Sequence, residues 1–255
     1  MPVPQKISFR RRKFTVRVLL PLLTKEGAGG YLASLRRRID IAEIAKREFF
    51  ITFEGVEGAG KTTQIALLRA ALEREHHTVC VTREPGGDAF AESIRSLLLN
   101  HTMTPRAELL LFLASRAQNV EQVIRPQLAA GSVVICDRYI DSSIAYQGCA
   151  RGLGRETVAA LNAFATADLV PDLTILLDLP PEIGLSRQTD RNRMEEESLP
   201  FHERVREGFL TSAANEPLRF RVLDASQPPE LIHGRIVTLV LGRLRDNAAQ
   251  TPPNN

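Results

Sequence analysis

The sequence predicts an α/β fold in which a doubly wound sheet of five parallel strands carries helices on both faces. From residue 49 onward, short and almost uninterrupted apolar runs alternate with stretches whose apolar residues have helical spacing. Such runs are typical of parallel strands, because helices cover both faces of the sheet. Polar clusters follow the strands, and ligands of these sheets bind outside the carboxyl ends of the strands. We therefore expect the functional site at that edge of the sheet.

Each expected strand is an apolar run of four or five residues that contains aromatic or β-branched side chains. A turn of glycine, proline or charged residues follows each run, which marks the point where the strand ends. In chain order, the expected strands cover residues 49–53, 78–81, 132–136, 173–177 and 220–223.

The expected helices are recognised by apolar residues three and four positions apart, such as Ile65, Leu68 and Leu72 in the first of them. Pro126 removes a helical hydrogen bond, so the long helix that contains it should kink or end nearby. In chain order, the expected helices cover residues 62–75, 89–99, 106–128, 155–166, 181–187, 199–214 and 230–244.

The 255 residues suffice for one large domain with an appendage, and the charge distribution separates the two. Residues 1–47 contain 12 Lys and Arg against 3 Asp and Glu, a net charge of +9, whereas the remainder carries −6, which gives +3 overall. We expect a basic, poorly ordered extension over 1–47, one folded domain over 48–248 and a frayed tail over 249–255. A basic arm also suits nucleic acid, anionic lipid or targeting, but the favoured interpretation is a dispensable leader.

Composition excludes several classes of protein. With 44% hydrophobic and 25% charged residues, the chain is neither wholly disordered, nor collagen, nor a coiled coil. No run approaches the ~20 apolar residues of a membrane span. Cys80, Cys136 and Cys149 form neither a disulfide framework nor a ligand-like spacing, so a cytoplasmic protein is expected. We expect neither a nucleic-acid partner nor a membrane partner for the folded domain.

The strongest motif lies directly after the first expected strand. Residues 55–62 read GVEGAGKT and match the phosphate-binding pattern G-x-x-x-x-G-K-[ST] between a strand and a helix, which predicts a P-loop NTPase-type fold. Glycines let backbone N–H groups converge on phosphate oxygens, and the helix N-terminus adds positive potential. Lys61 would neutralise phosphates, and Thr62 would hold Mg²⁺ through its hydroxyl. The expected nucleotide-binding residues are Gly55, Val56, Glu57, Gly58, Ala59, Gly60, Lys61, Thr62 and Thr63.

The remaining patterns narrow the chemistry of this loop. A GTPase would carry an Asn-Lys-x-Asp motif, and a mechanical ATPase usually has an Asp-Glu pair at the end of a strand. The chain has neither, and its third expected strand ends in Asp137 and Arg138. An arginine at that point suits a second phosphate, which favours phosphoryl transfer between two phosphorylated molecules. A catalytically inactive nucleotide-binding protein is the alternative from another class.

Three motifs in the same order resemble those of the thymidylate kinase family. They are residues 53–64 (FEGVEGAGKTTQ), 82–87 (TREPGG) and 137–139 with 142–148 (DRY and SSIAYQG), and the resemblance extends over roughly 49–245. It implies that the chain transfers the γ-phosphoryl group of ATP to dTMP, giving dTDP and ADP with Mg²⁺, and that it forms a homodimer. A kinase for another nucleoside monophosphate is the nearest alternative.

The resemblance also implies roles for single residues on the acceptor side. Phe112 and Arg116 are four residues apart, so they share one helix face and could stack a base and contact its carbonyl or phosphate. Thr62 and Asp137 would serve the Mg²⁺ site. The residues expected to bind dTMP are Glu57, Arg83, Pro85, Phe112, Arg116, Arg138, Ser143 and Tyr146.

A small lid over residues 186–195 is expected to supply a catalytic cation, because the phosphate-binding loop itself contains no arginine. This segment is a few residues shorter than is usual in the family, and Asn192 stands where an aspartate normally precedes Arg193. Its three arginines are equal candidates at this point. The expected catalytic residues are therefore Lys61, Arg138, Arg187, Arg191 and Arg193.

Overall fold

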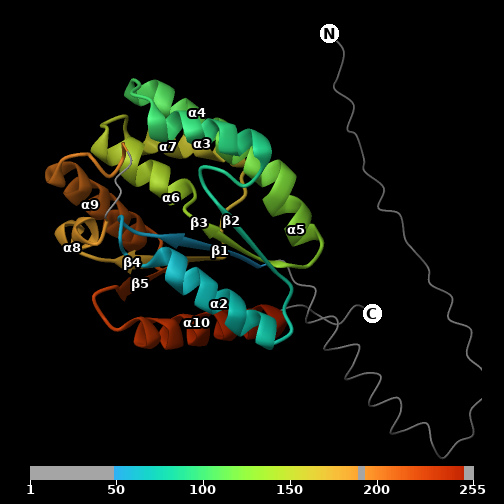
Figure 1. The fold of residues 1–255 in the computed structure, drawn as a ribbon. Helices are drawn as coiled ribbons and strands as arrows, with labels where there is room; N and C mark the ends of the chain where they lie inside the picture. Colours follow the sequence, from blue (N-terminus) through green and yellow to red (C-terminus); the bar gives the residue numbers. More distant parts are fainter. Residues whose placement is uncertain (1–48, 189–192, 250–255) are drawn as a thin grey trace, which may run out of the picture. The chain divides into compact units, whose positions relative to one another are not determined.

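The computed structural model describes residues 49–188 and 193–249, with side chains up to residue 246 (Figure 1). The predicted extension over 1–47, the residues 250–255 of the predicted tail and Arg191 of the predicted lid lie outside the described residues. Ala249 is the last residue of the final helix.

The sheet has five parallel strands in the order β2-β3-β1-β4-β5, so the predicted fold class is confirmed. Phe53, Asp137 and Arg83 are register partners on neighbouring strands, which brings the starts of the three sequence motifs side by side at the carboxyl edge. The strands are β1 (Phe49–Glu54), β2 (Val79–Arg83), β3 (Val133–Asp137), β4 (Leu173–Asp178) and β5 (Phe220–Asp224).

Helices lie on both faces of the sheet, with α2 and α10 on one side and α4, α5 and α7 on the other (Figure 1). Local signals set several of their starts: the side chain of Asp88 accepts a hydrogen bond from the N–H of Ala91 at the start of α3, and Pro105 opens α4. The helices are α2 (Lys61–Arg74), α3 (Ala89–Asn100), α4 (Pro105–Asn119), α5 (Arg125–Ala129), α6 (Ile140–Ser143), α7 (Arg155–Thr166), α8 (Pro181–Ser186), α9 (Leu199–Asn215) and α10 (Pro229–Ala249). Two π-helical turns are η1 (Val120–Ile124) and η2 (Ile144–Ala150).

Strand β1 has apolar residues at successive positions because it is buried on both faces of the sheet. All six of its residues are buried, because alternate side chains enter different cores on the two faces of the sheet. Phe49, Ile51 and Phe53 belong to one core, and Phe50 belongs to the other. The first core includes Leu68 and Leu72 of α2 with Ile236 and Val240 of α10, and the second includes Val120, Ile124 and Leu128.

Two helical regions differ from the sequence prediction. The expected helix over 106–128 is α4, η1 and α5 in succession, so the change in the helix begins at Val120 rather than at Pro126. Pro126 lies in the first turn of α5, where its missing N–H is tolerated. The segments α6 and η2 were not expected to be helical, because their Ser, Asp and Gly residues favour caps and turns over helix interiors.

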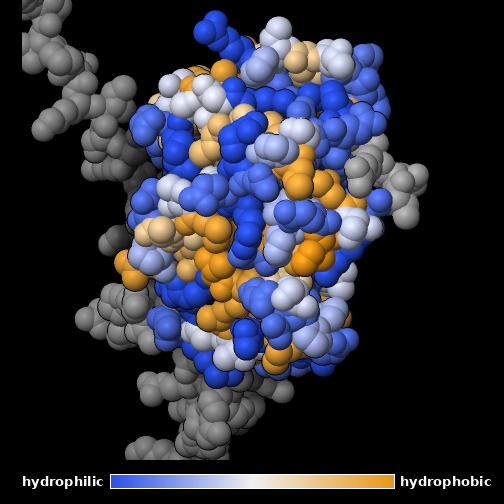
Figure 2. All heavy atoms as spheres, turned by 90° about the vertical axis from the view of Figure 1, so that its left-hand side faces the viewer, coloured by the Kyte–Doolittle hydropathy of each residue, from blue (hydrophilic) through white to orange (hydrophobic). Residues whose placement is uncertain are grey.

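The surface on the side of α8 and α9 is mostly hydrophilic, with hydrophobic residues gathered over its middle (Figure 2). Among the residues that the structure describes, no helix is both long enough and apolar enough to cross a membrane.

Candidate functional site

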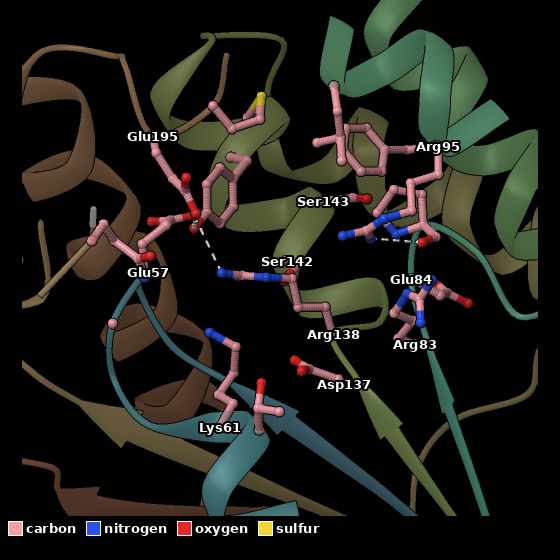
Figure 3. Close-up of a pocket in the computed structure, with 18 of the residues that line it drawn as sticks. Glu57, Lys61, Arg83, Glu84, Arg95, Asp137, Arg138, Ser142, Ser143 and Glu195 are labelled. Atoms are coloured by element: carbon pink, nitrogen blue, oxygen red, sulfur yellow. Dashed lines mark hydrogen bonds and ion pairs between the residues drawn. The ribbon is translucent and has the colours of Figure 1, made fainter. Parts of the chain in front are cut away.

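A pocket of about 510 Å³ lies at the carboxyl edge of β1, β2 and β3 (Figure 3). Four parts of the chain form its walls: the phosphate-binding loop, the end of β2, helix α4 and the segment from Asp137 through η2. Residues on both sides of the undescribed segment 189–192 complete it. The predicted site residues in its lining are Glu57, Gly58, Gly60, Lys61, Thr62, Thr63, Arg83, Pro85, Phe112, Arg116, Asp137, Arg138, Ser143, Tyr146 and Arg187.

The phosphate-binding loop turns between β1 and α2 through three positive φ angles, which glycine adopts without the steric cost of a Cβ. Gly55, Gly58 and Gly60 have φ angles of 141°, 69° and 88°. A Cβ on Gly55 would lie 2.4 Å from the carbonyl oxygen of Leu177, so the loop also packs closely on β4. The side chains of Val56 and Ala59 are buried in the core, so these two residues can offer a nucleotide only their backbone.

Lys61 is folded back over this loop. Its Nζ donates hydrogen bonds to the carbonyl oxygens of Gly55 and Val56, at 3.1 and 3.0 Å. Burial and the neighbouring charge of Arg138 lower the pKa of Lys61 to about 8, because both disfavour the ammonium form. An anion bound in the loop would favour the ammonium form of Lys61 and so raise its pKa.

A hydrogen-bonded group of Glu57, Arg138 and Tyr146 lies beside the loop (Figure 3). Arg138 adopts a φ of 69°, and its guanidinium donates to the Gly55 carbonyl oxygen and to Glu57 Oε1, at 3.0 and 3.2 Å. Tyr146 donates its hydroxyl to the same Glu57 oxygen at 2.5 Å. Burial alone would raise the pKa of Glu57, but Arg138, His202 and Lys61 outweigh it and hold this pKa at about 2. Glu57 is therefore an ionised carboxylate that accepts hydrogen bonds.

Asp137 and Thr62 provide oxygens that suit a magnesium ion. Both residues line the pocket, and Mg²⁺ in phosphate sites usually takes one or two protein oxygens together with phosphate and water. Asp137 Oδ1 is buried and has no hydrogen-bond partner within the described part of the chain. A buried carboxylate oxygen of this kind fits a site that a hydrated cation completes.

Arg116 is held rigidly at the far end of the pocket, with 1% of its surface exposed. A guanidinium has five N–H donors, and four described acceptors take one each. One N–H is left for a ligand, which suits a single carbonyl oxygen better than the paired oxygens of a phosphate. The four acceptors are Glu84 Oε2 at 2.6 Å, Ser143 Oγ at 2.8 Å, Asn162 Oδ1 at 2.5 Å and the Tyr139 carbonyl oxygen at 2.9 Å.

Arg95 and His202 belong to this site although no sequence motif contains them. Arg95 lines the pocket and donates to the carbonyl oxygen of Pro85 at 2.9 Å, whereas the guanidinium of Arg83 is paired with Glu92 at 2.9 Å. Only the helical position of Arg95, on the pocket side of α3, could have suggested its role. His202 lies behind Glu57 with Nδ1 3.3 Å from Oε2, and no motif contains it.

The lid arginines are placed differently from one another. Arg187 lines the pocket and donates to the carbonyl oxygen of Gly58 at 2.9 Å. Arg193 is not part of the pocket lining, because its guanidinium binds Glu108 at 2.7 Å and the Leu98 carbonyl oxygen at 3.0 Å. Its predicted catalytic role stays a prediction.

Comparison with known proteins identifies the family. The family model described as thymidylate kinase matches residues 53–236. The thymidylate kinase of Solidesulfovibrio magneticus is 52% identical over 208 residues, which cover 76% of this chain and 99% of the relative. That of Geobacter sulfurreducens is 50% identical over 208 residues, 77% of this chain and 98% of the relative. A crystal structure of the thymidylate kinase of Ehrlichia chaffeensis has a TM-score of 0.65 and 35% identity, covering 76% of this chain and 99% of that one. The chain therefore belongs to the thymidylate kinase family.

Proposed function

We propose that this chain transfers the γ-phosphoryl group of ATP to dTMP, giving dTDP and ADP. One observation carries the proposal: a triphosphate-binding loop and a second group of cations and hydrogen-bonding side chains line the same pocket. Phosphoryl transfer depends on positioning and charge neutralisation more than on covalent chemistry of the protein. A pocket that holds two phosphorylated molecules side by side meets that requirement.

On the donor side, backbone N–H groups of the loop would bind the β and γ phosphates of ATP, and Lys61 would neutralise their charge. The pKa of Lys61 should rise on binding, because the phosphates favour its charged form. Thr62 and Asp137 would hold Mg²⁺, which when bound neutralises charge on the phosphate oxygens. Thr62 offers its hydroxyl, and Asp137 offers the buried oxygen that lacks another described partner.

On the acceptor side, the ionised Glu57 would accept a hydrogen bond from the 3′-hydroxyl of dTMP. Arg138 is fixed between this carboxylate and the loop, so its remaining N–H groups can meet the phosphate of dTMP as it faces ATP. Arg116 would donate its remaining N–H to a thymine carbonyl oxygen while Phe112 stacks on the ring. The other proposed contacts are Arg83, Pro85, Ser143 and Tyr146.

Arg187 is the described lid arginine best placed to act on the transferring phosphoryl group. It reaches the carbonyl oxygen of Gly58, inside the loop that would hold the phosphates. Electrostatic stabilisation of this kind needs a cation close to the developing charge. Arg191 stays a candidate from the sequence alone.

We also propose a cytoplasmic homodimer, on the basis of family resemblance. Exposed apolar side chains on α3, α4 and α7 support a contact with a second copy, because removing apolar surface from water favours association. Phe90, Leu110 and Phe164 are 58%, 60% and 88% exposed.

The test is turnover of purified protein with ATP and a panel of monophosphates: dTMP, dUMP, UMP and AMP. We expect the highest kcat/KM for dTMP, and preference for a ribonucleotide would refute the proposed acceptor. Binding of ATP without transfer to any acceptor would favour an inactive nucleotide-binding protein instead. Lys61→Ala, purified in parallel, should have no measurable turnover, which checks that the activity does not come from a contaminating kinase.

A further inference from the structure

Glu108 is a buried carboxylate that lies outside the pocket lining and joins three separate segments. Its side chain is 1% exposed at the start of α4. Gln147 of η2 donates to it at 2.9 Å, and Arg151, the residue after η2, donates to it at 3.1 and 3.2 Å. From the described part of the lid, Arg193 approaches it at 2.7 Å. One carboxylate thus receives N–H groups from two arginines and an amide.

The charges in this cluster balance. Arg151 also pairs with Glu197 at 2.7 Å, so two carboxylates face two guanidinium groups. Burial would raise the pKa of Glu108, but hydrogen bonds from Arg151, Gln147 and Arg193 outweigh it and hold the pKa below its ordinary value. Glu108 is therefore ionised at neutral pH, as the two arginines require.

Arg193 is bound at two points on the same side of the molecule. Its Nη1 faces Glu108, and its Nε donates to the carbonyl oxygen of Leu98 near the end of α3. The two residues that follow it, Met194 and Glu195, line the pocket, and Glu195 lies near Glu57 (Figure 3). The positions of Met194 and Glu195 thus depend on the contacts of Arg193 with Glu108 and with the Leu98 carbonyl oxygen.

The same helix that carries Glu108 also carries the proposed base-binding residues. Glu108, Phe112 and Arg116 are spaced four residues apart, so they form one stripe along α4. A residue that binds Glu108 therefore has a fixed position relative to Phe112 and Arg116, at the acceptor end of the pocket.

We propose that Glu108 is a positioning residue which, by binding Arg193, holds residues 193–195 against the dTMP side of the pocket. Arg193 is then an anchor and not a cation that acts on the transferring phosphoryl group. This inference rests on the proposed dTMP site.

A catalytic role and an anchoring role of Arg193 predict different effects on dTMP binding in the absence of ATP. A cation on the transferring phosphoryl group contributes only when ATP is bound, and its loss lowers kcat by about 10²–10³-fold. An anchor shapes the pocket in the absence of ATP, so its loss weakens binding of dTMP alone. The affinity for dTMP without ATP therefore separates them.

The experiment measures the Kd of dTMP by isothermal titration calorimetry on the full chain without ATP. The variants are Glu108→Gln, Arg193→Met and the two combined. We expect each single change to weaken dTMP binding about tenfold. The double variant should bind dTMP no more weakly than the more impaired single variant, since both single changes already remove the Glu108–Arg193 pair. Arg193→Lys, which keeps the charge, should restore affinity to within about threefold of the unchanged protein.

The matched control is Glu121→Gln, the same substitution at an exposed glutamate whose partner Arg125 lies 3.5 Å away. Exposed pairs contribute little, so its Kd should not change. Unchanged dTMP affinity in Arg193→Met, together with a large loss of kcat, would overturn the inference and make Arg193 catalytic. Additive losses in the double variant would also overturn it.

Urea unfolding of each variant shows whether the variant is folded, which separates a loss of dTMP affinity from a general loss of the fold. If Glu108→Gln does not fold, Arg193→Met and Arg193→Lys still decide the question through dTMP affinity. If the unchanged protein does not bind dTMP at all, the proposed function itself fails, which the experiment reports separately from the role of Arg193.

Discussion

Replacing Gly184 by alanine should push helix α8 away from the phosphate-binding loop. A Cβ at Gly184 would lie 2.1 Å from the carbonyl oxygen of Glu57, and a Cβ at Gly58 would lie 2.2 Å from the carbonyl oxygen of Gly184. Both obstacles are backbone atoms, so no side chain can rotate away to make room. The loop or the helix has to move by about 1 Å to reach an ordinary contact distance.

The expected cost follows from two opposing effects. Forcing an additional methyl group into a packed region costs about 1–3 kcal/mol. Alanine in a helix otherwise gains about 0.5–1 kcal/mol over glycine. We expect a net loss of about 1–2 kcal/mol, or a fall in Tm of about 2–8 °C for a protein of this size. Because the displaced carbonyl belongs to the loop that would bind ATP, kcat/KM for ATP should fall about tenfold or more.

The matched control is Gly234→Ala on α10, where a Cβ would meet nothing within 4 Å. This variant should keep wild-type kinetics and gain about 1–4 °C in Tm. Differential scanning calorimetry and steady-state kinetics measure both proteins side by side. A Gly184→Ala protein as stable and as active as Gly234→Ala would refute the close approach of α8 to the loop.

Two further predictions concern buried polar groups. Burial, together with Asp141, raises the pKa of Glu54 to about 7, so the stability that its protonated form contributes is complete below about pH 4.5 and is lost as the pH rises through about 7. Glu54→Gln lacks this titration, so the free energy of unfolding of wild type relative to the variant should fall by about 2.5 kcal/mol between pH 5 and pH 8. Urea denaturation measures this difference, and a constant difference over that range would contradict the prediction. Asn162→Leu removes an acceptor from the buried Arg116, so the KM for dTMP should rise about tenfold while the KM for ATP stays unchanged. An equal rise in both constants would indicate a general loss of the fold instead.

The fold was predictable because its signals are local. The five apolar runs became the five strands, with end points that differ by at most two residues, since burial on both faces demands consecutive apolar side chains. The helical segments α6 and η2 were missed, because Ser, Asp and Gly residues favour turns. Their helical form depends on packing against the distant helices α7 and α9.

By itself, the sequence determined the phosphate-binding loop and the edge of the sheet where the site lies, because strand, loop and helix are contiguous in the chain. Tertiary structure alone decided what each distant side chain binds. The acceptors that leave Arg116 a single donor come from Glu84 just after β2, from α7 and from the segment between Tyr139 and Ser143. Arg193 and Glu108 are 85 positions apart, and no sequence pattern near either residue predicts their ion pair. Local patterns reflect neighbours along the chain, whereas such pairings form only when distant elements pack together and exclude water from their charges.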